Sequence, residues 1–294
     1  MHNDPNIKGA SVKAEEEFKK QYPAVYNYLE GHKEKLSKRN KAETGIRYEW
    51  YALQRWGSNY SEELIRPILR GKDIKRYSYE FAQLWVIYVP CGYTNNHKGN
   101  SDPETWFKKT HPSIYSYLIN TEMELSKNRS KKSKGLYKRD DQGDYWWELR
   151  SCKYLDDFNK QKIIYPNMTK YLPFYLDNNN FYVNQKCFII TGRHLGYLTA
   201  FLNSKLFKYC FRDSFPQLQG GTRELSKIFF EKIKIKMISD SLNEIFESKV
   251  IKLQSSIAEA KDTTAIELEI DEMILDLYNL TEKEKNQIMS FSIL

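Results

Sequence analysis

The chain has 294 residues, of which 40% are hydrophobic, so it can bury a sizeable core and is not disordered throughout. Lysine and arginine outnumber aspartate and glutamate by 46 to 38, and the net charge of +8 favours a polyanionic partner. The four cysteines and five histidines do not cluster, which excludes zinc-ligand spacing and predicts a reduced, cytoplasmic protein without a structural metal.

An N-terminal helical segment is predicted over residues 1–45, and part of it recurs later in the chain. FKKQYPAVYNYL begins at Phe18, FKKTHPSIYSYL begins 89 residues later at Phe107, and LSK follows at the same offset in both. Each copy predicts a helix with proline in its first turn, then a basic loop, then an aromatic strand. The internal repeat therefore lies near residues 18–55 and 107–150.

The second basic loop carries Lys132 and Lys134 and leads to the aromatic pair Trp146 and Trp147. A charged loop between two ordered elements favours contact with phosphates, although such a block is often simply solvated. Because alternate residues of a strand face opposite sides, at least one of the two tryptophans is expected in the core.

Between the two copies, short strands are predicted around a turn at residues 70–73, where Arg70 and Asp73 either face a ligand or pair with each other. The apolar run at residues 84–90 indicates a buried strand and is too short to span a membrane. Further strands are predicted over residues 162–190 and one helix from Arg193 onward.

A loop with two glycines, Gly220 and Gly221, ends at Arg223. Two small residues beside an arginine admit a phosphate, but they also suit a plain connecting turn. From about Ser239 the spacing of apolar residues predicts amphipathic helices, and Thr281 with Glu284 predicts a capping box for the last of them. The fold class is therefore α+β.

No catalytic motif is found in the chain. It contains no P-loop, no GxGxxG and no GxSxG, and the nearest approach to the base-gripping segment of an amino-methyltransferase, residues 165–168, has the wrong order. The letters of a nuclease Glu-x-Lys motif occur at residues 17–19 and 259–261, but both lie in helical, lysine-rich and glutamate-rich stretches. We predict no catalytic residue and no metal ligand.

The string PILRGKDIKRY, Pro67 to Tyr77, resembles the P-x-L-x-G-K/R-D-I-x-R-Y signature of TaqI-like C-terminal specificity domains. These are the recognition part of adenine-specific DNA methyltransferases, including the fused Type IIG restriction-modification enzymes. Residues 144–168, 194–207 and 220–235 resemble further pieces of the family in the same order, and residues 270–288 are similar to its terminal helices.

The resemblance implies sequence-specific recognition of double-stranded DNA in a restriction-modification system. It implies a mixed-sheet target recognition domain over residues 46–238 with flanking helices, followed by a C-terminal helical spacer over residues 239–294. In the family, the S-adenosylmethionine site lies in an upstream half that this sequence lacks. The methyl donor is therefore expected in a methyltransferase domain or subunit, with a nuclease as a further candidate partner.

On this interpretation, basic side chains bind phosphates and a few polar ones contact base edges. The expected phosphate contacts are Lys72, Lys75, Arg76, Lys132, Lys134 and Arg223, with Gly220 and Gly221 allowing close approach. The expected base-edge contacts are Arg70, Arg150, Arg193 and Gln217, and the expected stacking or wedge groups are Trp146 and Tyr165. Two alternatives stay open: a nuclease with an unrecognised site near Asp73, and a protein-interaction module that uses the helical tail.

Overall fold

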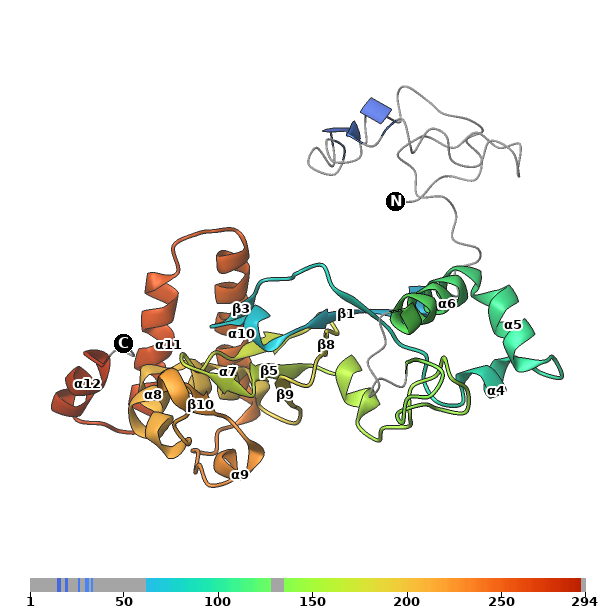
Figure 1. Ribbon diagram of the computed structural model, residues 1–294. Coiled ribbons are helices and arrows are strands. Elements are labelled where there is room, and N and C mark those ends of the chain that lie inside the picture. Colours follow the sequence, from blue (N-terminus) through green and yellow to red (C-terminus); the bar gives the residue numbers. More distant parts are fainter. Residues whose placement is uncertain are drawn as a thin grey trace. The chain divides into compact units, whose positions relative to one another are not determined.

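The computed structural model describes residues 62–127 and 135–291, together with a few isolated positions between residues 15 and 33 (Figure 1). The chain divides into two compact units. The first combines Met1–Glu62 with Lys98–Ser130, and the second combines Glu63–His97 with Lys131–Leu294. The predicted α+β class is confirmed, because several small sheets are combined with helices in separate stretches of the chain.

In the first unit, a helical hairpin forms the second copy of the repeat. Helix α5 (Pro103–Thr110) and helix α6 (Pro112–Lys127) are separated by one residue. Asp102 caps α5 by accepting a hydrogen bond of 2.9 Å from the Thr105 amide, and proline occupies the first turn of both helices. Most of the first copy, and the strand expected after it, lie outside the described residues.

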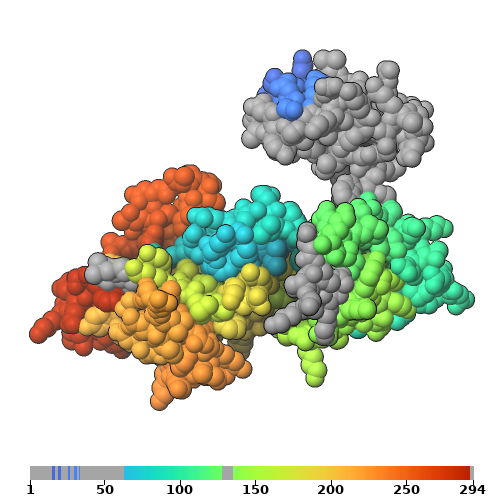
Figure 2. Space-filling view, in the orientation of Figure 1, coloured from blue at the N-terminus to red at the C-terminus, as the bar shows by residue number. Residues whose placement is uncertain are grey.

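Two three-stranded sheets form the centre of the second unit. In the first, β5 (Lys162–Pro166) lies between β7 (Tyr175–Asp177) and β9 (Cys187–Ile190) and pairs antiparallel with both. In the second, β1 (Ile65–Leu69) pairs antiparallel with β4 (Trp85–Ile87) and parallel with β8 (Tyr182–Val183). Figure 2 shows the consequence: residues 63–97, in cyan, pack directly against residues that follow much later, in yellow.

Two short strand pairs and seven helices complete the described part of this unit. Strand β2 (Ile74–Lys75) pairs with β3 (Ser78–Tyr79), and β6 (Met168–Thr169) pairs with β10 (Arg223–Glu224). The helices are α4 (Tyr93–His97), α7 (Leu195–Asn203), α8 (Lys205–Phe211), α9 (Lys227–Phe230), α10 (Asp240–Ala258), α11 (Thr264–Leu277) and α12 (Glu282–Met289). Among the residues that the structure describes, no helix is long and apolar enough to cross a membrane.

Three of the predicted elements differ from the structure. The apolar run at residues 84–90 contains the strand β4, but this strand is not buried, because 56% of the surface of Trp85 is exposed. The single helix expected from Arg193 is in fact two, because Ser204 leaves the helical conformation and its hydroxyl caps α8 by accepting from the Phe207 amide at 3.1 Å. The strand expected at Trp146 and Trp147 is a series of turns with one isolated bridge nearby. The capping box of Thr281 and Glu284 at the start of α12 is confirmed.

One hydrophobic core joins the sheets to the C-terminal helices. Phe201 of α7 and Phe174 beside β7 pack in the same cluster as Val250 of α10 and Ile274 of α11. Helix α7 approaches α10 so closely that a β-carbon on Gly196 would lie 2.4 Å from the β-carbon of Glu247. Helices α10 and α11 therefore contribute to this core, and the domain boundary at residue 239 stays a prediction.

Candidate nucleic-acid interface

The signature turn is held together by Arg70 and Asp73. Asp73 is buried in a 3-10 turn and accepts hydrogen bonds from the Arg70 amide at 2.8 Å, from its Nε at 2.9 Å and from its Nη2 at 2.8 Å. Burial acts to raise the pKa of Asp73, but the hydrogen bonds and charge of Arg70 outweigh it and the pKa is lowered. Arg70 therefore braces the turn, which is the second of the two roles that its sequence allowed.

Gly71 brings this turn against the loop between β8 and β9. A β-carbon at Gly71 would lie 2.9 Å from the carbonyl oxygen of Lys186 and 3.4 Å from the β-carbon of Pro166. Because the first of these atoms is backbone, it cannot swing away as a side chain could. The glycine of the signature is thus explained by close packing, and this packing places Lys72 and Lys186 on the border of the same hollow.

That hollow, here called the basic groove, has a volume of about 1030 Å³. It is bordered by the signature turn and β2, by residues 166–173, and by α8 and α11. Two carboxylates, Glu267 and Asp271, also line it. The lining cations outnumber them and are Lys72, Lys75, Arg76, Lys186, Lys205 and Lys208. The groove is therefore suited to an anion.

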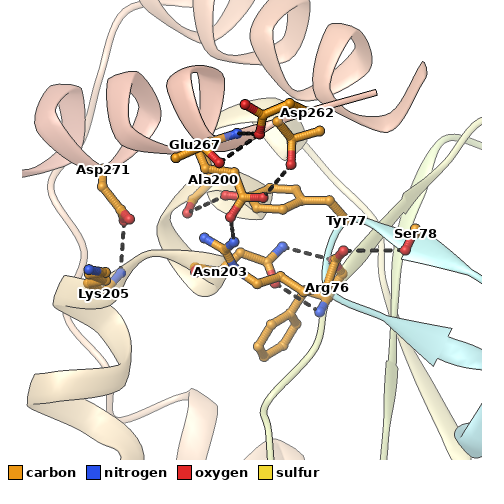
Figure 3. A network of polar contacts seen from close by, with 12 residues as sticks. Arg76, Tyr77, Ser78, Ala200, Asn203, Lys205, Asp262, Glu267 and Asp271 are labelled. Atoms are coloured by element: carbon orange, nitrogen blue, oxygen red, sulfur yellow. Dashed lines mark hydrogen bonds and ion pairs between the residues drawn. The ribbon is translucent and has the colours of Figure 1, made fainter. Parts of the chain in front are cut away.

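Three of these cations already have partners. Arg76 pairs with Glu267 and donates its Nε to the Asn203 carbonyl at 3.2 Å (Figure 3). Lys75 lies 3.3 Å from a Glu80 carboxylate oxygen, and the Lys205 ammonium donates to the Met289 carbonyl at 2.7 Å. Arg76, expected to bind phosphate, is thus engaged by α11 in the structure.

The other three, Lys72, Lys186 and Lys208, form no ion pair with any described residue. Lys72 and Lys186 are exposed, while Lys208 is partly buried in α8. Burial, and then the nearby charge of Arg76, lowers the pKa of Lys208 to about 8. A bound anion would offset the free-energy cost of keeping the Lys208 ammonium charged in a partly buried place, so Lys208 is suited to pair with an anion.

The wall beneath these lysines is polar and tightly bonded. Figure 3 shows Asp271 beside Lys205, where the carboxylate accepts a 2.8 Å hydrogen bond from the Lys205 amide. Burial raises the pKa of Asp271, so its negative charge is held there at a cost. Met168 and Tyr171 also line the groove, with 47% and 61% of their surface exposed.

Sequence reasoning missed part of this lining, namely Met168, Tyr171, Lys186, Lys205 and Lys208. These residues lie on segments far from the signature turn. Met168 and Lys205 belong to the stretches that resemble the family, but nothing in the sequence marks them as part of one groove. Tyr171 lies between Lys170 and Leu172, and no signal in the sequence marks it as exposed.

Tyr165 needs correction as a stacking group. It lies on β5 with 4% of its surface exposed, and its ring packs 5.4 Å from that of Phe174 and 5.1 Å from that of Phe230. The ring is part of the core, because β5 is the central strand of its sheet and all five of its residues are buried. Burial also raises its pKa far above that of free tyrosine.

The two tryptophans differ in burial, although they lie in turns and not in a strand. Trp147 is buried and its indole N–H donates to the Thr94 hydroxyl at 2.9 Å, which confirms that one of the pair is in the core. Trp146 is partly exposed and meets the Tyr137 ring edge-on with centroids 4.7 Å apart. Its role as a stacking group stays a prediction.

The loop with two glycines uses its arginine internally. The Arg223 side chain is buried, pairs with Asp213 at 2.6 Å and donates to the Phe215 carbonyl at 3.0 Å. Gly220 and Gly221 have φ values of 71° and 75°, and a β-carbon on either would meet nothing within 4 Å, so the turn needs them for its conformation. A phosphate contact by Arg223 is disfavoured, since its guanidinium already has two partners.

The remaining predicted residues are scattered over the surface. Gln217 and Arg150 are exposed, and Arg193 is 80% exposed beside Asp240, with 3.0 Å between the Nη2 atom and a carboxylate oxygen. None of the three lines the basic groove. Lys132 and Lys134 lie outside the described residues.

One cluster resembles a metal site in composition. Cys91, Asp144 and Glu148 bring their ligand atoms within 4.8 Å of one another. Glu148, however, is buried and accepts hydrogen bonds from the amides of Gly92, Thr94 and Asp144 at 2.8 to 3.1 Å. These bonds explain its burial, because they tie two loops of the second unit together.

Comparison with known proteins agrees with this arrangement. Residues 66–235 match the TaqI-like C-terminal specificity domain, a range that contains the signature turn and every strand pair described above except the first residue of β1. The chain is also 24% identical over 225 residues to the Type II methyltransferase M.MjaIV of Methanocaldococcus jannaschii, covering 74% of this chain and 70% of that protein. Since the match spans more than half of the chain, this protein belongs to the family of TaqI-like C-terminal specificity domains.

Proposed function

We propose that this chain recognises a short sequence in double-stranded DNA as the specificity part of a restriction-modification system. One observation carries the proposal: the signature turn of a specificity domain borders a groove in which Lys72, Lys186 and Lys208 have no ion pair among the described residues. Unpaired lysines along one hollow suit the regularly spaced charges of a phosphate backbone.

In the proposed complex, the three lysines neutralise phosphates and set the position of the duplex. This contribution is independent of sequence and depends on salt, because binding releases condensed counterions. Exposed side chains beyond the groove then contact base edges, and the candidates are Gln217, Arg150 and Arg193. Met168 and Tyr171 offer apolar surface to a base or sugar at the border.

The methyl transfer itself is assigned to a partner. The expected donor, S-adenosylmethionine, carries a sulfonium cation, and the unpaired charges of the basic groove are also cations. The groove is therefore a poor fit for that cofactor, which supports a separate methyltransferase domain or subunit. We further propose that the complete system modifies adenine, in the Type IIG arrangement with an endonuclease and in the cytoplasm.

The alternative function, a nuclease with its active site at Asp73, has less support. A metal-dependent nuclease needs carboxylate oxygens free to hold a cation, whereas both oxygens of Asp73 accept bonds from Arg70. The rival interaction module relied on a separate helical tail, but α10 and α11 bury their apolar faces in the core of the second unit.

The test is selection from a pool of random duplexes at two salt concentrations, followed by sequencing of the bound fraction. We expect enrichment of one short site and an affinity that falls steeply with salt. The double variant Lys72→Gln, Lys186→Gln should weaken all binding. Its matched control is Lys234→Gln, Lys252→Gln, which removes the same charge from exposed lysines outside the groove. Equal losses in both variants would contradict the groove assignment.

A further inference from the structure

The two copies of the internal repeat share side-chain contacts as well as amino-acid sequence. In the second copy the Tyr115 hydroxyl donates to Glu104 at 2.7 Å, and in the first copy the Tyr26 hydroxyl donates to Glu15 at 3.0 Å. Both members of the second pair follow their counterparts by 89 residues. Two hydrogen bonds at one offset indicate that the same local structure occurs twice.

A second contact repeats at the same offset. The Lys19 ammonium lies 5.0 Å from the centre of the Tyr26 ring, and the Lys108 ammonium lies 5.8 Å from the centre of the Tyr115 ring. The first unit therefore contains two copies of one helical module, here called the hairpin module. Its copies start at Glu15 and Glu104.

Most of the basic surplus of the chain belongs to these modules and the loops after them. Residues 15–41 contain seven lysines and arginines and five glutamates, and residues 104–139 contain nine lysines and arginines and three glutamates. Their net charges of +2 and +6 together equal the +8 of the whole chain, so the remaining residues carry no net charge. The excess of basic over acidic residues, which favours a polyanionic partner, thus comes from the repeat rather than from the basic groove.

The residues that are identical in the two copies fall into two kinds: some are explained by packing, and others are exposed. Phe107 is fully buried and Tyr115 makes the contacts above, so packing explains why the repeat keeps a phenylalanine and a tyrosine at these two places. Packing does not explain Lys109. It is exposed and has no ion pair in the described structure, as is also true of its counterpart Lys20.

We propose that the two hairpin modules bind the sugar–phosphate backbone of duplex DNA through Lys20 and Lys109, as a sequence-independent surface in addition to the basic groove. The inference rests on the proposed function. Two equivalent cationic modules in one chain fit a polymer that presents the same charged group repeatedly. An acidic protein partner would have to offer two matching patches.

The test uses the full chain and a duplex of random sequence. The slope of log affinity against log salt should fall by about 0.9 for Lys20→Gln or Lys109→Gln alone and by about twice that for both. The site enriched from a random pool should not change, because these lysines touch no base. Thermal unfolding should match that of the wild type, since both side chains are exposed.

The control is the double variant Lys234→Gln, Lys252→Gln, which removes two exposed charges from the second unit. An unchanged slope in Lys20→Gln, Lys109→Gln, with a reduced slope in Lys72→Gln, Lys186→Gln, would overturn this inference and leave the proposed function intact. Absence of DNA binding by the wild-type chain would overturn both. Displacement of the duplex by polyglutamate at equal charge concentration would also overturn it, in favour of an acidic protein partner.

Discussion

The two glycine-containing turns of the second unit, residues 70–73 and 217–223, use their arginines alike but present different surfaces. In each turn the arginine is bound to an aspartate, Arg70 to Asp73 and Arg223 to Asp213. The first turn lies beside lysines of the basic groove that have no ion pair among the described residues. The second exposes uncharged side chains, among them Gln217.

The difference shows that an arginine next to glycine is not by itself a phosphate ligand. Asp73 belongs to the same turn as its arginine and is buried, whereas Asp213 is 82% exposed and reaches Arg223 from a separate turn. What makes the first turn a candidate interface is Lys186, which Gly71 brings close from a different loop. Five sets of variants test this comparison.

The largest effect on stability is expected from Asp73→Asn. It leaves the partly buried Arg70 without its charged partner and should lower the free energy of unfolding by about 2 kcal/mol, measured by urea denaturation. Asp213→Asn should cost less, because that carboxylate is largely exposed and Arg223 keeps the Phe215 carbonyl. Equal losses would mean that the two turns are braced alike.

The Asp73 effect should also depend on pH. Because its pKa is lowered on folding, the stabilisation is present above the unfolded pKa and is lost as the pH falls through the folded pKa. The difference in stability between wild type and Asp73→Asn should therefore shrink in acid.

Gly71→Ala is expected to come next. Its β-carbon would meet the Lys186 carbonyl oxygen at 2.9 Å, and the backbone shift should cost about 1–3 kcal/mol. Gly220→Ala meets open space but has a φ of 71°, so about 1 kcal/mol is expected from conformation alone. Thermal unfolding compares the two. A harmless Gly71→Ala would refute the close packing of the signature turn.

The groove lysines should affect DNA binding without affecting stability. Lys72→Gln with Lys186→Gln should reduce the salt slope of binding by about 1.8. The sequence preference should persist, since phosphate contacts carry no base information. Fluorescence anisotropy at several salt concentrations measures the slope, and a changed preference would instead assign these lysines to base contacts.

Lys208 should make binding depend on pH. With a pKa lowered to about 8, its ammonium is mostly present at pH 7 and mostly lost at pH 9. Affinity for random DNA should therefore fall across that range, while Lys208→Arg, which stays charged, should not show this component. The same fall in both proteins would place the titrating group elsewhere.

The smallest change in total affinity is expected from Gln217→Ala. The residue is exposed and outside the groove, so affinity for random DNA and thermal stability should not change. The enriched site should become less strict at one position, because an amide that contacts a base edge contributes discrimination. An unchanged site would remove Gln217 from the candidate contacts.

The sequence by itself determined the features that depend on neighbouring residues. The α+β class, the helix now seen as α10 and the capping box at Thr281 follow from periodicity and capping chemistry. The signature at residues 67–77 and the repeat at an offset of 89 residues could also be identified without coordinates. These signals are local, and local physics is the same before and after folding.

Only the tertiary structure decided which side chains are available to a ligand. It paired Arg70, Arg76 and Arg223 with carboxylates, buried Tyr165, and gathered Lys72, Lys186 and Lys208 from three separate segments. For Arg76 and the three lysines, the physical reason is that a charge is free or engaged according to groups far away in the sequence. Such pairings arise from the packing of α8, α10 and α11 on the sheets, which no spacing of residue types records.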